Sequence, residues 1–464
     1  MKRILYLLFP VLLMSVAVSC SRDYDDDYMG DVDERLNQAM TAYRNELIGA
    51  EHGWMADVNT SEGIYRFYMK FYNDSVTMTS NNMYQDCRVP STSTYRFKAL
   101  QRPTIIFDTY SYLAVICDPD DSISGGDDNQ GLLTDFEFEV ASFENGVFNL
   151  VGRTHGAEAT FRKATAEEER MGLDADRGLV SVFNQLDEYL AGRYPYIETE
   201  YGPMELDLGY RLLSTAYALP DGSAAIESEV TNIVIDYDRS IRPVKPVTVG
   251  NVSISELAWN GSGYDAMLVG GGQLPVKLSA KHVVPLNVFL GFEKDKKFNV
   301  FFNASQWFDQ MADEPFGKLL DGYQKEMTST FRNLTIKQFQ VRFETAFNDK
   351  TGTYDKFINV VTVFGPPTES YFAIYSYDIT FDENTPGVFT TGSVYFRADS
   401  DDPGYNELLL SSGVGKKLLN SLNYRTFKID WAGRMEYKGS TFELGGFVDA
   451  ADPTFRVYGV MDKL

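Results

Sequence analysis

Aspartates gather in one short stretch of the chain, DPDDSISGGDDN between residues 118 and 129, and carboxylate oxygens are the ligands that calcium prefers. The stretch departs from the EF-hand loop, because Ile123 stands where that loop requires glycine and Asn129 where it places a bidentate glutamate. We therefore expect a solvated connection between strands and no bound metal. The residues that a different hard-cation loop would use are Asp118, Asp120 and Asp127.

Catalytic templates are mostly absent from the sequence. The three histidines, His52, His155 and His282, lie in no HExxH or other paired zinc spacing. There is no GxSxG motif, and VGGGQL lacks the lysine of a phosphate-binding loop. A glycosidase needs only two carboxylates roughly 5 to 10 Å apart, so a chain with 66 acidic residues leaves that activity open. We expect no cofactor.

Cysteine use allows two interpretations of Cys87 and Cys117. In an exported domain an even pair permits one disulfide, which would close a loop of about 30 residues. Two buried thiols are the alternative, because an unpaired cysteine behaves as a small apolar side chain. The sequence leaves both open.

Tryptophans are the natural candidates for stacking against a sugar ring, yet three of the four lie in alternating strand patterns. Trp54, Trp259 and Trp431 are therefore expected to pack in cores, with Trp54 closing a barrel end beneath the preceding helix. Trp307 differs, because its neighbours from Phe308 to Tyr323 carry more apolar surface than one helix face buries. Trp307 is the candidate ligand-binding residue, and a helix covering a core is the alternative.

The N-terminus predicts an export signal and a lipid anchor. Lys2 and Arg3 precede an apolar run. This run is too short for a membrane-spanning helix, which needs about 20 residues. The run ends at Ala17-Val18-Ser19-Cys20, where small residues precede a cysteine as a lipoprotein signal peptidase requires. We expect residues 1–19 to be removed and Cys20 to become the acylated N-terminus, so that the protein meets the membrane through its lipid.

Charge excludes two classes of partner. The chain carries 42 Lys plus Arg against 66 Asp plus Glu, a net charge of −24, and loss of Lys2 and Arg3 makes it −26. Such a protein repels phosphate backbones and anionic lipid surfaces, so nucleic acid is not an expected partner. The acidic run after Cys20, SRDYDDD, is either a solvated tether or a signal for display on the outer surface.

Hydrophobic periodicity predicts the elements that must position these residues. A helical period from 31 to 50 is followed by alternating segments with turns every 8 to 12 residues, which indicates antiparallel strands. The fold class is mainly β, with two antiparallel β-meander domains, barrel-like or sandwich-like, and a few packed α-helices. The predicted parts are a signal peptide (1–19), an acidic tether (20–30), a helix plus β-meander domain (31–163), a helical connector (164–192) and a C-terminal β-rich domain (193–464). An alternative divides the last into sub-domains 193–300 and 334–464 around a helical segment, 303–331.

The first domain resembles a family of Bacteroidales lipoproteins called domain of unknown function 4302. The likeness is carried by ERLNQAMTAYRNELIGAEHGWMADV, which begins at Glu34, by YRFYMKFYNDSVTMTS, and by the later strands up to residue 163. The later segment ISELAWNG shows a weaker similarity to the same family. The resemblance implies an outer-membrane lipoprotein beside an importer of the starch-utilisation type, which combines a TonB-dependent pore with a binding lipoprotein. The family has no assigned catalytic residues to carry over.

We therefore expect a surface-exposed outer-membrane lipoprotein that is not itself an enzyme and that assists the capture of a glycan or peptide beside an importer. Two alternatives remain. A secreted glycosidase or peptidase would need a pocket with two carboxylates or a metal. An adhesin or structural partner would show a flat apolar patch around residues 303–331.

Overall fold

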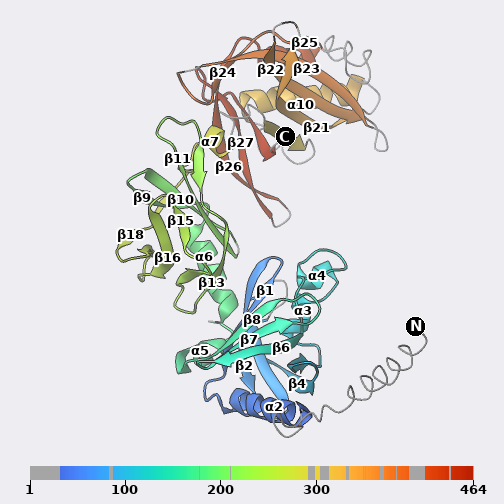
Figure 1. Cartoon of the computed structure of the whole chain (residues 1–464). Helices are drawn as coiled ribbons and strands as arrows, with labels where there is room; N and C mark the ends of the chain where they lie inside the picture. The colour runs from blue at the N-terminus through green and yellow to red at the C-terminus, as the bar shows by residue number, and fades with distance from the viewer. Residues whose placement is uncertain are drawn as a thin grey trace, which may run out of the picture. The chain divides into compact units, whose positions relative to one another are not determined.

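The chain forms two compact units, residues 1–184 and residues 185–464. Both are built mainly from antiparallel strands, which confirms the predicted fold class (Figure 1). The computed structural model describes residues 32–82, 87–176, 178–209, 211–290, 298–303, 313–330, 334–348, 350, 352–365, 370–382, 384–396, 413–437 and 440–462.

The first unit is a closed antiparallel barrel in which every strand pairs with the next in the chain and β8 returns to β1. Alternating side chains point inward and outward, as the period of two in the sequence requires. The strands are β1 (Trp54–Thr60), β2 (Gly63–Phe71), β3 (Ser75–Ser80), β4 (Ser91–Ala99), β5 (Pro103–Phe107), β6 (Glu137–Glu144), β7 (Val147–Gly152) and β8 (Glu158–Lys163).

Apolar side chains fill the barrel and close both of its ends. Helix α2 (Val32–Gly49) covers the end where β1 begins, and the fully buried Trp54 donates its indole N–H to the Leu47 carbonyl at 2.9 Å. Near the other end lies α3 (Tyr112–Ile116), whose Leu113 and Ile116 join the same core. Trp54 therefore closes the barrel beneath the helix, as the sequence predicts.

Gly53 joins α2 to β1 and must be glycine. Its φ of +76° lies in the left-handed region, and a Cβ there would approach the Met69 carbonyl oxygen to 2.6 Å. This close approach brings the helix end onto the strands and explains why Gly-Trp stands at the entrance to the barrel.

Two helices follow the barrel, α5 (Ala166–Gly172) and α6 (Leu179–Leu190), within the helical connector that the sequence predicts over 164–192. Thr165 and Glu168 form a capping box at the start of α5, and Leu173 caps its end. Helix α5 packs against β2, and Thr79 of the neighbouring strand β3 donates to the Gly172 carbonyl at 2.8 Å.

The second unit begins with a curled antiparallel sheet, the middle sheet. Its strands are β9 (Tyr194–Thr199), β10 (Gly202–Leu208), β11 (Leu212–Ala218), β12 (Ala225–Glu227), β13 (Thr231–Ile235), β14 (Ile241–Pro243), β15 (Val247–Val249), β16 (Val252–Trp259), β17 (Tyr264–Leu268), β18 (Gln273–Pro275) and β19 (Lys277–Ser279). Strand β18 pairs with β17 and β19 pairs with β9, yet only Val276 separates β18 from β19. The two ends of the sheet therefore meet in one short segment, so the sheet curls almost into a barrel.

The third sheet closes on itself through the pairing of β22 with β23. Its first strand, β20, lies between β21 and the last strand, β28. The strands are β20 (Phe298–Asn303), β21 (Thr335–Asn348), β22 (Thr353–Gly365), β23 (Tyr371–Phe381), β24 (Val388–Thr391), β25 (Tyr395–Phe396), β26 (Thr426–Tyr437), β27 (Ser440–Asp449) and β28 (Arg456–Asp462). A sub-domain boundary at residue 300 would therefore cut a strand of the third sheet.

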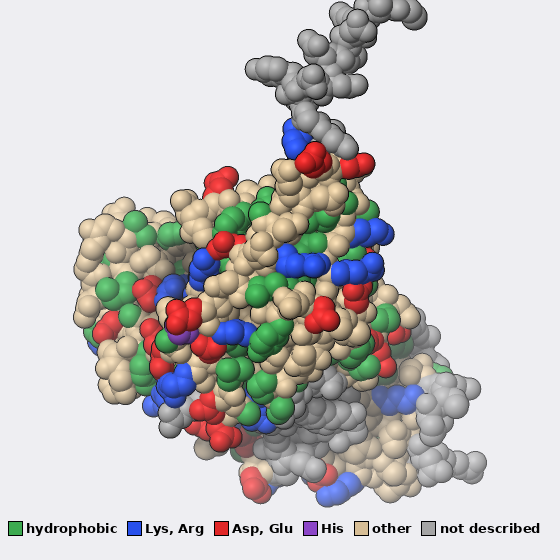
Figure 2. Space-filling view, turned by 90° about the horizontal axis from the view of Figure 1, so that it is seen from below, with side chains coloured by type: hydrophobic (Ala, Val, Ile, Leu, Met, Phe, Trp, Pro, Cys, Tyr) green, Lys and Arg blue, Asp and Glu red, His purple; other side chains and the backbone are tan. Residues whose placement is uncertain are grey.

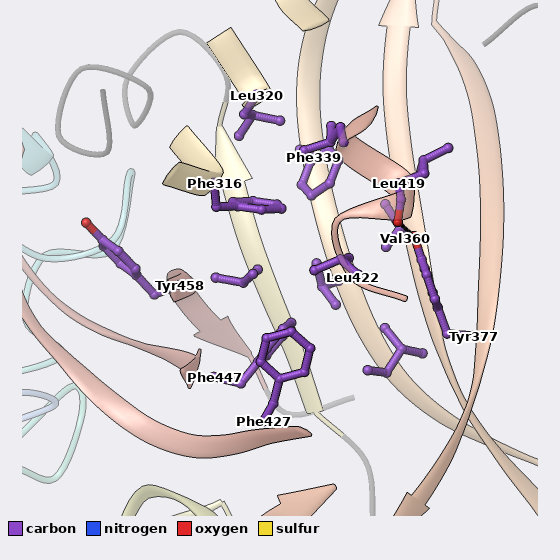
Figure 3. Packing of buried hydrophobic residues seen from close by; sticks show 14 of the residues in the cluster. Phe316, Leu320, Phe339, Val360, Tyr377, Leu419, Leu422, Phe427, Phe447 and Tyr458 are labelled. Carbon is purple, nitrogen blue, oxygen red and sulfur yellow. Dashed lines mark hydrogen bonds between the residues drawn. The ribbon is translucent and has the colours of Figure 1, made fainter. Parts of the chain in front are cut away.

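Helices α10 (Pro315–Thr330) and α12 (Gly413–Asn420) complete the core of the third sheet. Figure 3 shows Phe316 and Leu320 of α10 beside Phe339, with Phe427 and Phe447 facing each other further along the core. The predicted helix over 303–331 is corrected at its start, because residue 303 ends strand β20, which pairs along its whole length with β21.

The surface carries charges of both signs. On the face shown in Figure 2, hydrophobic side chains are scattered among acidic and basic ones and form no single large patch. Within the described part of the chain, no helix is long and apolar enough to cross a bilayer.

Candidate functional site

His282 lies in the second unit, in the short connection between β19 and α7 (Leu286–Phe289). Side chains from two strands of the middle sheet and two strands of the third sheet surround it. We call this group the His282 cluster: Tyr194 of β9, Glu205 and Asp207 of β10, His282, Trp431 and Arg434 of β26, and Glu443 of β27.

Glu205 holds the connection in place. One carboxylate oxygen lies 2.5 Å from His282 Nδ1, and the other accepts the backbone N–H groups of Val283 at 2.8 Å and Val284 at 3.3 Å. The side chains of His282 and Glu205 are only 11% and 12% exposed. Both oxygens of this nearly buried carboxylate already have hydrogen-bond donors. Glu205 therefore fixes both the imidazole and the backbone that follows it.

Glu443 reaches the same imidazole from the third sheet. Its Oε2 lies 3.3 Å from His282 Nε2 and accepts the Tyr194 hydroxyl at 2.7 Å, and its Oε1 accepts from the Arg434 guanidinium. Because Tyr194 belongs to the middle sheet and Glu443 to the third, these contacts join the two sheets of the second unit.

Aromatic rings enclose the imidazole on both faces. The centroid of Tyr194 lies 3.7 Å from that of His282, and Trp431 stacks on the other side at 3.8 Å with planes 23° apart. The Trp431 indole donates to the Val284 carbonyl at 2.9 Å, and the Arg434 guanidinium lies 4.3 Å from the Tyr194 ring centre. Rings with electron-rich faces stabilise a cation between them.

The charges of the cluster favour the imidazolium form. Burial alone would lower the pKa of His282, but the contacts with Glu205 and Glu443 outweigh it and raise that pKa above its usual value. Burial would likewise raise the pKa of Glu443, yet the contacts with His282, Tyr194 and Arg434 hold it below its usual value. The cluster is therefore a cation between two anions.

This arrangement suits an ionic contact that joins the two sheets better than it suits a catalytic base. A general base needs a ring nitrogen that can reach a substrate proton, and here both nitrogens of His282 face carboxylates. An imidazolium can donate its Nδ1–H to Glu205 and attract Glu443 across the 3.3 Å from Nε2, which forms an ion pair there but no hydrogen bond. Neutral imidazole cannot do both, because it carries only one N–H and no charge. The geometry supports attraction between the two sheets rather than proton abstraction.

The other two histidines each make one short side-chain contact and one longer contact with a carboxylate, His52 with Glu51 at 4.0 Å and His155 with Asp135 at 3.9 Å. His52 Nδ1 lies 2.8 Å from Glu169 Oε2 on the outside of the barrel, and His155 Nδ1 lies 2.8 Å from the Thr134 carbonyl oxygen. Asp135 is buried beside His155 and accepts the backbone N–H groups of residues 154, 155 and 157. These contacts fix a turn rather than build a site.

Cys20 and Trp307, the lipidation site and the ligand-binding candidate of the sequence, both lie outside the described residues. Cys87 and Cys117 are thiols in the structure, so no disulfide joins them. Cys87 is buried, whereas Cys117 follows α3 and packs against the barrel core. Burial raises the pKa of the Cys117 thiol to about 12, which makes it a poor nucleophile.

The acidic loop between β5 and β6 directs its carboxylates to local bonds. Asp118 accepts the Tyr110 hydroxyl at 2.6 Å, and Asp120 caps helix α4 (Asp121–Ser124) by accepting the Ser122 N–H at 2.9 Å. The backbone of Asp127 forms an isolated β-bridge with that of Gly131. Across the described ranges, no three His, Cys, Asp or Glu side chains are grouped so as to hold a metal ion.

Reasoning from the sequence missed the His282 cluster entirely. Its members come from positions 194, 205, 282 and 431–443, and no spacing rule links them. Trp431 packs against the core of the third sheet, as the sequence predicts, but it is only half-buried and also stacks on His282. In β10 the acids Glu205 and Asp207 alternate with the buried Met204 and Leu206, which is the ordinary pattern of a strand with one exposed face and gives no signal of a site.

Comparisons with known proteins give one informative result. A family model described as "Domain of unknown function (DUF4302)" matches residues 25–261, which covers the barrel, α5, α6 and the middle sheet as far as β16. No curated protein matches the chain.

Among solved structures, the β subunit of DNA polymerase of Streptococcus pyogenes is 10% identical, with 91% of this chain and 96% of that chain covered, at a TM-score of 0.14. The DNA polymerase III β subunit of Thermotoga maritima is 8% identical, with 79% and 95% covered, at a TM-score of 0.12. At such TM-scores the likeness carries no conclusion about fold or function.

Proposed function

We propose that this chain, which belongs to the DUF4302 family, is a lipid-anchored outer-membrane lipoprotein of the cell surface that assists nutrient capture beside a TonB-dependent importer. The nutrient is a glycan or a peptide, and the protein's part is to bind or present it rather than to cleave it.

The observation that carries the proposal is the sequence around Cys20. A basic start, an apolar run and Ala17-Val18-Ser19 before a cysteine are the features that lipoprotein processing requires. A single acylated N-terminus would hold the protein at the membrane, and two or more acyl chains make such anchoring stable. The acidic residues Asp25, Asp26 and Asp27 directly behind Cys20 support export to the outer face.

The geometry of the His282 cluster supports a role other than catalysis. Its histidine, two glutamates and tyrosine are the described side chains that most resemble acid–base machinery, yet they bond to one another. A group of this kind stabilises the fold that presents a binding surface.

The first experiment tests the anchor. Cells expressing the wild type, Cys20→Ala or the control Cys87→Ala are labelled with a palmitate analogue and fractionated. We expect label and membrane attachment in the wild type and in Cys87→Ala, and neither in Cys20→Ala. Labelled Cys20→Ala protein would exclude the lipid anchor at this cysteine.

The second experiment tests display and transport. Replacing Asp25, Asp26 and Asp27 by alanine should keep the protein in the membrane but abolish its labelling by an impermeant surface reagent. A strain without the protein should take up a labelled oligosaccharide or peptide more slowly, and the wild type should restore the uptake while Cys20→Ala should not. Unchanged uptake of both nutrient classes in the deletion strain would contradict the role in capture.

A further inference from the structure

The His282 cluster has a property that goes beyond anchoring and nutrient capture. It is the place where the middle sheet and the third sheet of the second unit exchange charged contacts through one ionisable ring. We propose that His282 is a pH-sensitive clasp, which holds the two sheets together while its imidazole is protonated and loosens them when it loses its proton.

The geometry makes the proton decisive. With both ring nitrogens protonated, the imidazolium donates toward Glu205 at 2.5 Å and pairs with Glu443 at 3.3 Å. A neutral ring keeps only one N–H, so the other nitrogen would present its lone pair to a carboxylate at the same distance. The ring has little room to turn away, because Tyr194 and Trp431 lie 3.7 Å and 3.8 Å from it.

The surrounding charges set the direction of the response. The groups that face His282 are the carboxylates Glu205, Asp207 and Glu443, the guanidinium Arg434 and the phenol Tyr194. Three carboxylates against one guanidinium leave an excess of negative charge, which favours the protonated ring. The raised pKa of His282 agrees with this balance, so the clasp is closed below the ordinary histidine pKa and opens as the pH rises through the raised value.

Opening has a defined structural result. Glu205 also holds the N–H groups of Val283 and Val284, and Trp431 holds the Val284 carbonyl. When the imidazole no longer binds Glu205 and Glu443 together, this connection loses its ionic link between the sheets, while the hydrogen bonds from Tyr194 to Glu443 and from Trp431 to Val284 remain. Phe289 of α7, which is 41% exposed and packs against Trp431, would be released with it.

Hydrogen exchange measured by mass spectrometry tests the clasp in the full mature protein. The peptide covering residues 280–290 is compared at about pH 6 and about pH 9, after correction for the intrinsic effect of pH on exchange. We expect its opening to increase on the order of tenfold at the higher pH, which corresponds to ~1.4 kcal/mol. His282→Gln cannot titrate, so its opening should not change with pH. His52→Gln, which alters the histidine–glutamate pair of the first unit, should behave as the wild type does.

A second measurement leaves every residue of the His282 cluster unchanged. The chain has three histidines, so the NMR signals of their rings can be assigned with His52→Gln and His155→Gln alone. We expect the His282 signal to titrate above pH ~6.5, the ordinary value for histidine. A His282 signal that titrates at or below that value would overturn the proposal, as would identical pH profiles for the wild type and His282→Gln. Neither result would bear on the lipid anchor or on nutrient uptake.

Discussion

The two units each contain a histidine–glutamate contact, and the two contacts differ in burial and in surroundings. On the barrel of the first unit, His52 and Glu169 lie 2.8 Å apart, with side chains 32% and 25% exposed, and Lys70 shares the same carboxylate. In the second unit, His282 and Glu205 are only 11% and 12% exposed, and a second carboxylate and two rings surround the imidazole. Water screens the first contact but is largely excluded from the second.

The units accordingly depend on different forces. The first is a barrel filled with apolar side chains and closed by helices at its ends, so its main elements meet through non-directional burial. The second has to join two separate sheets, and it does so in part through charged groups whose attraction depends on protonation. We therefore expect the second unit to respond more strongly than the first to a rise in pH.

The largest effect is expected from removing the closure of the barrel. Trp54→Ala deletes a fully buried indole and leaves a cavity, which costs ~3–5 kcal/mol in the free energy of unfolding. Hydrogen exchange of β1–β8 against denaturant should show this loss in the first unit. Peptides of the second unit should keep their midpoint.

Trp259→Ala is the matched control in the second unit, since Trp259 is half-buried and packs beside Tyr189 and Tyr264. Its substitution should affect only the middle sheet and by less. Equal losses from both variants would mean that Trp54 does not close the barrel.

A smaller effect is expected from Glu205→Gln. The amide keeps the size of the side chain but removes the charge that pairs with His282, and charge-assisted hydrogen bonds contribute ~1.5–3 kcal/mol. We expect the peptide of residues 280–290 to lose protection against hydrogen exchange, and the pKa of His282 to fall as well. Protection that survives while the pKa falls would show that Glu205 sets the charge of the ring without holding the connection.

At alkaline pH the second unit should lose stability while the first should not. Because the pKa of His282 is raised in the folded protein, its contribution is complete below the ordinary histidine pKa and is lost as the pH rises through the raised value. The pKa of Glu169 is lowered, mainly by Lys70 and then His52, so its contribution is lost only as the pH falls through the lowered value.

Melting followed separately in each unit should therefore show the second unit weakening from neutral to alkaline pH while the first does not. Both should weaken in acid, since the pKa of Glu443 is lowered as well. A first unit that loses stability in parallel at alkaline pH would remove the contrast.

The smallest effect is expected from Glu169→Gln. Pairs as exposed as this one contribute less than ~1 kcal/mol, so the barrel should unfold within that margin of the wild type, as judged from its denaturant midpoint. A loss as large as that of Glu205→Gln would mean that burial does not explain the difference between the two histidine–glutamate contacts.

The sequence predicts those features that depend on neighbouring residues. The helix before Gly53, the burial of Trp54 and the curling of alternating strands all follow from local periods and turns. The predicted connector of residues 164–192 contains two helices, α5 and α6, and the apolar stripe that indicates a helix begins only at Leu179.

The His282 cluster was out of reach for a different reason. Glu205 and Glu443 are brought together by the closure of two sheets, and neither closure leaves a pattern in a short stretch of residues. Strand alternation indicates which side chains share a face but not which distant strand will lie opposite.

The pairing of β20 with β28 has a consequence for how the molecule is made. Its register sets Asn299 opposite Asp462, residues 163 positions apart. Contacts between such distant positions form slowly, because the entropy cost of closing a long loop comes before the favourable energy of the contact. Until β28 arrives, the edges of β20 and β27 remain without their partner, and exposed strand edges recruit other chains. During biogenesis the third sheet is therefore the region that most needs protection by a chaperone.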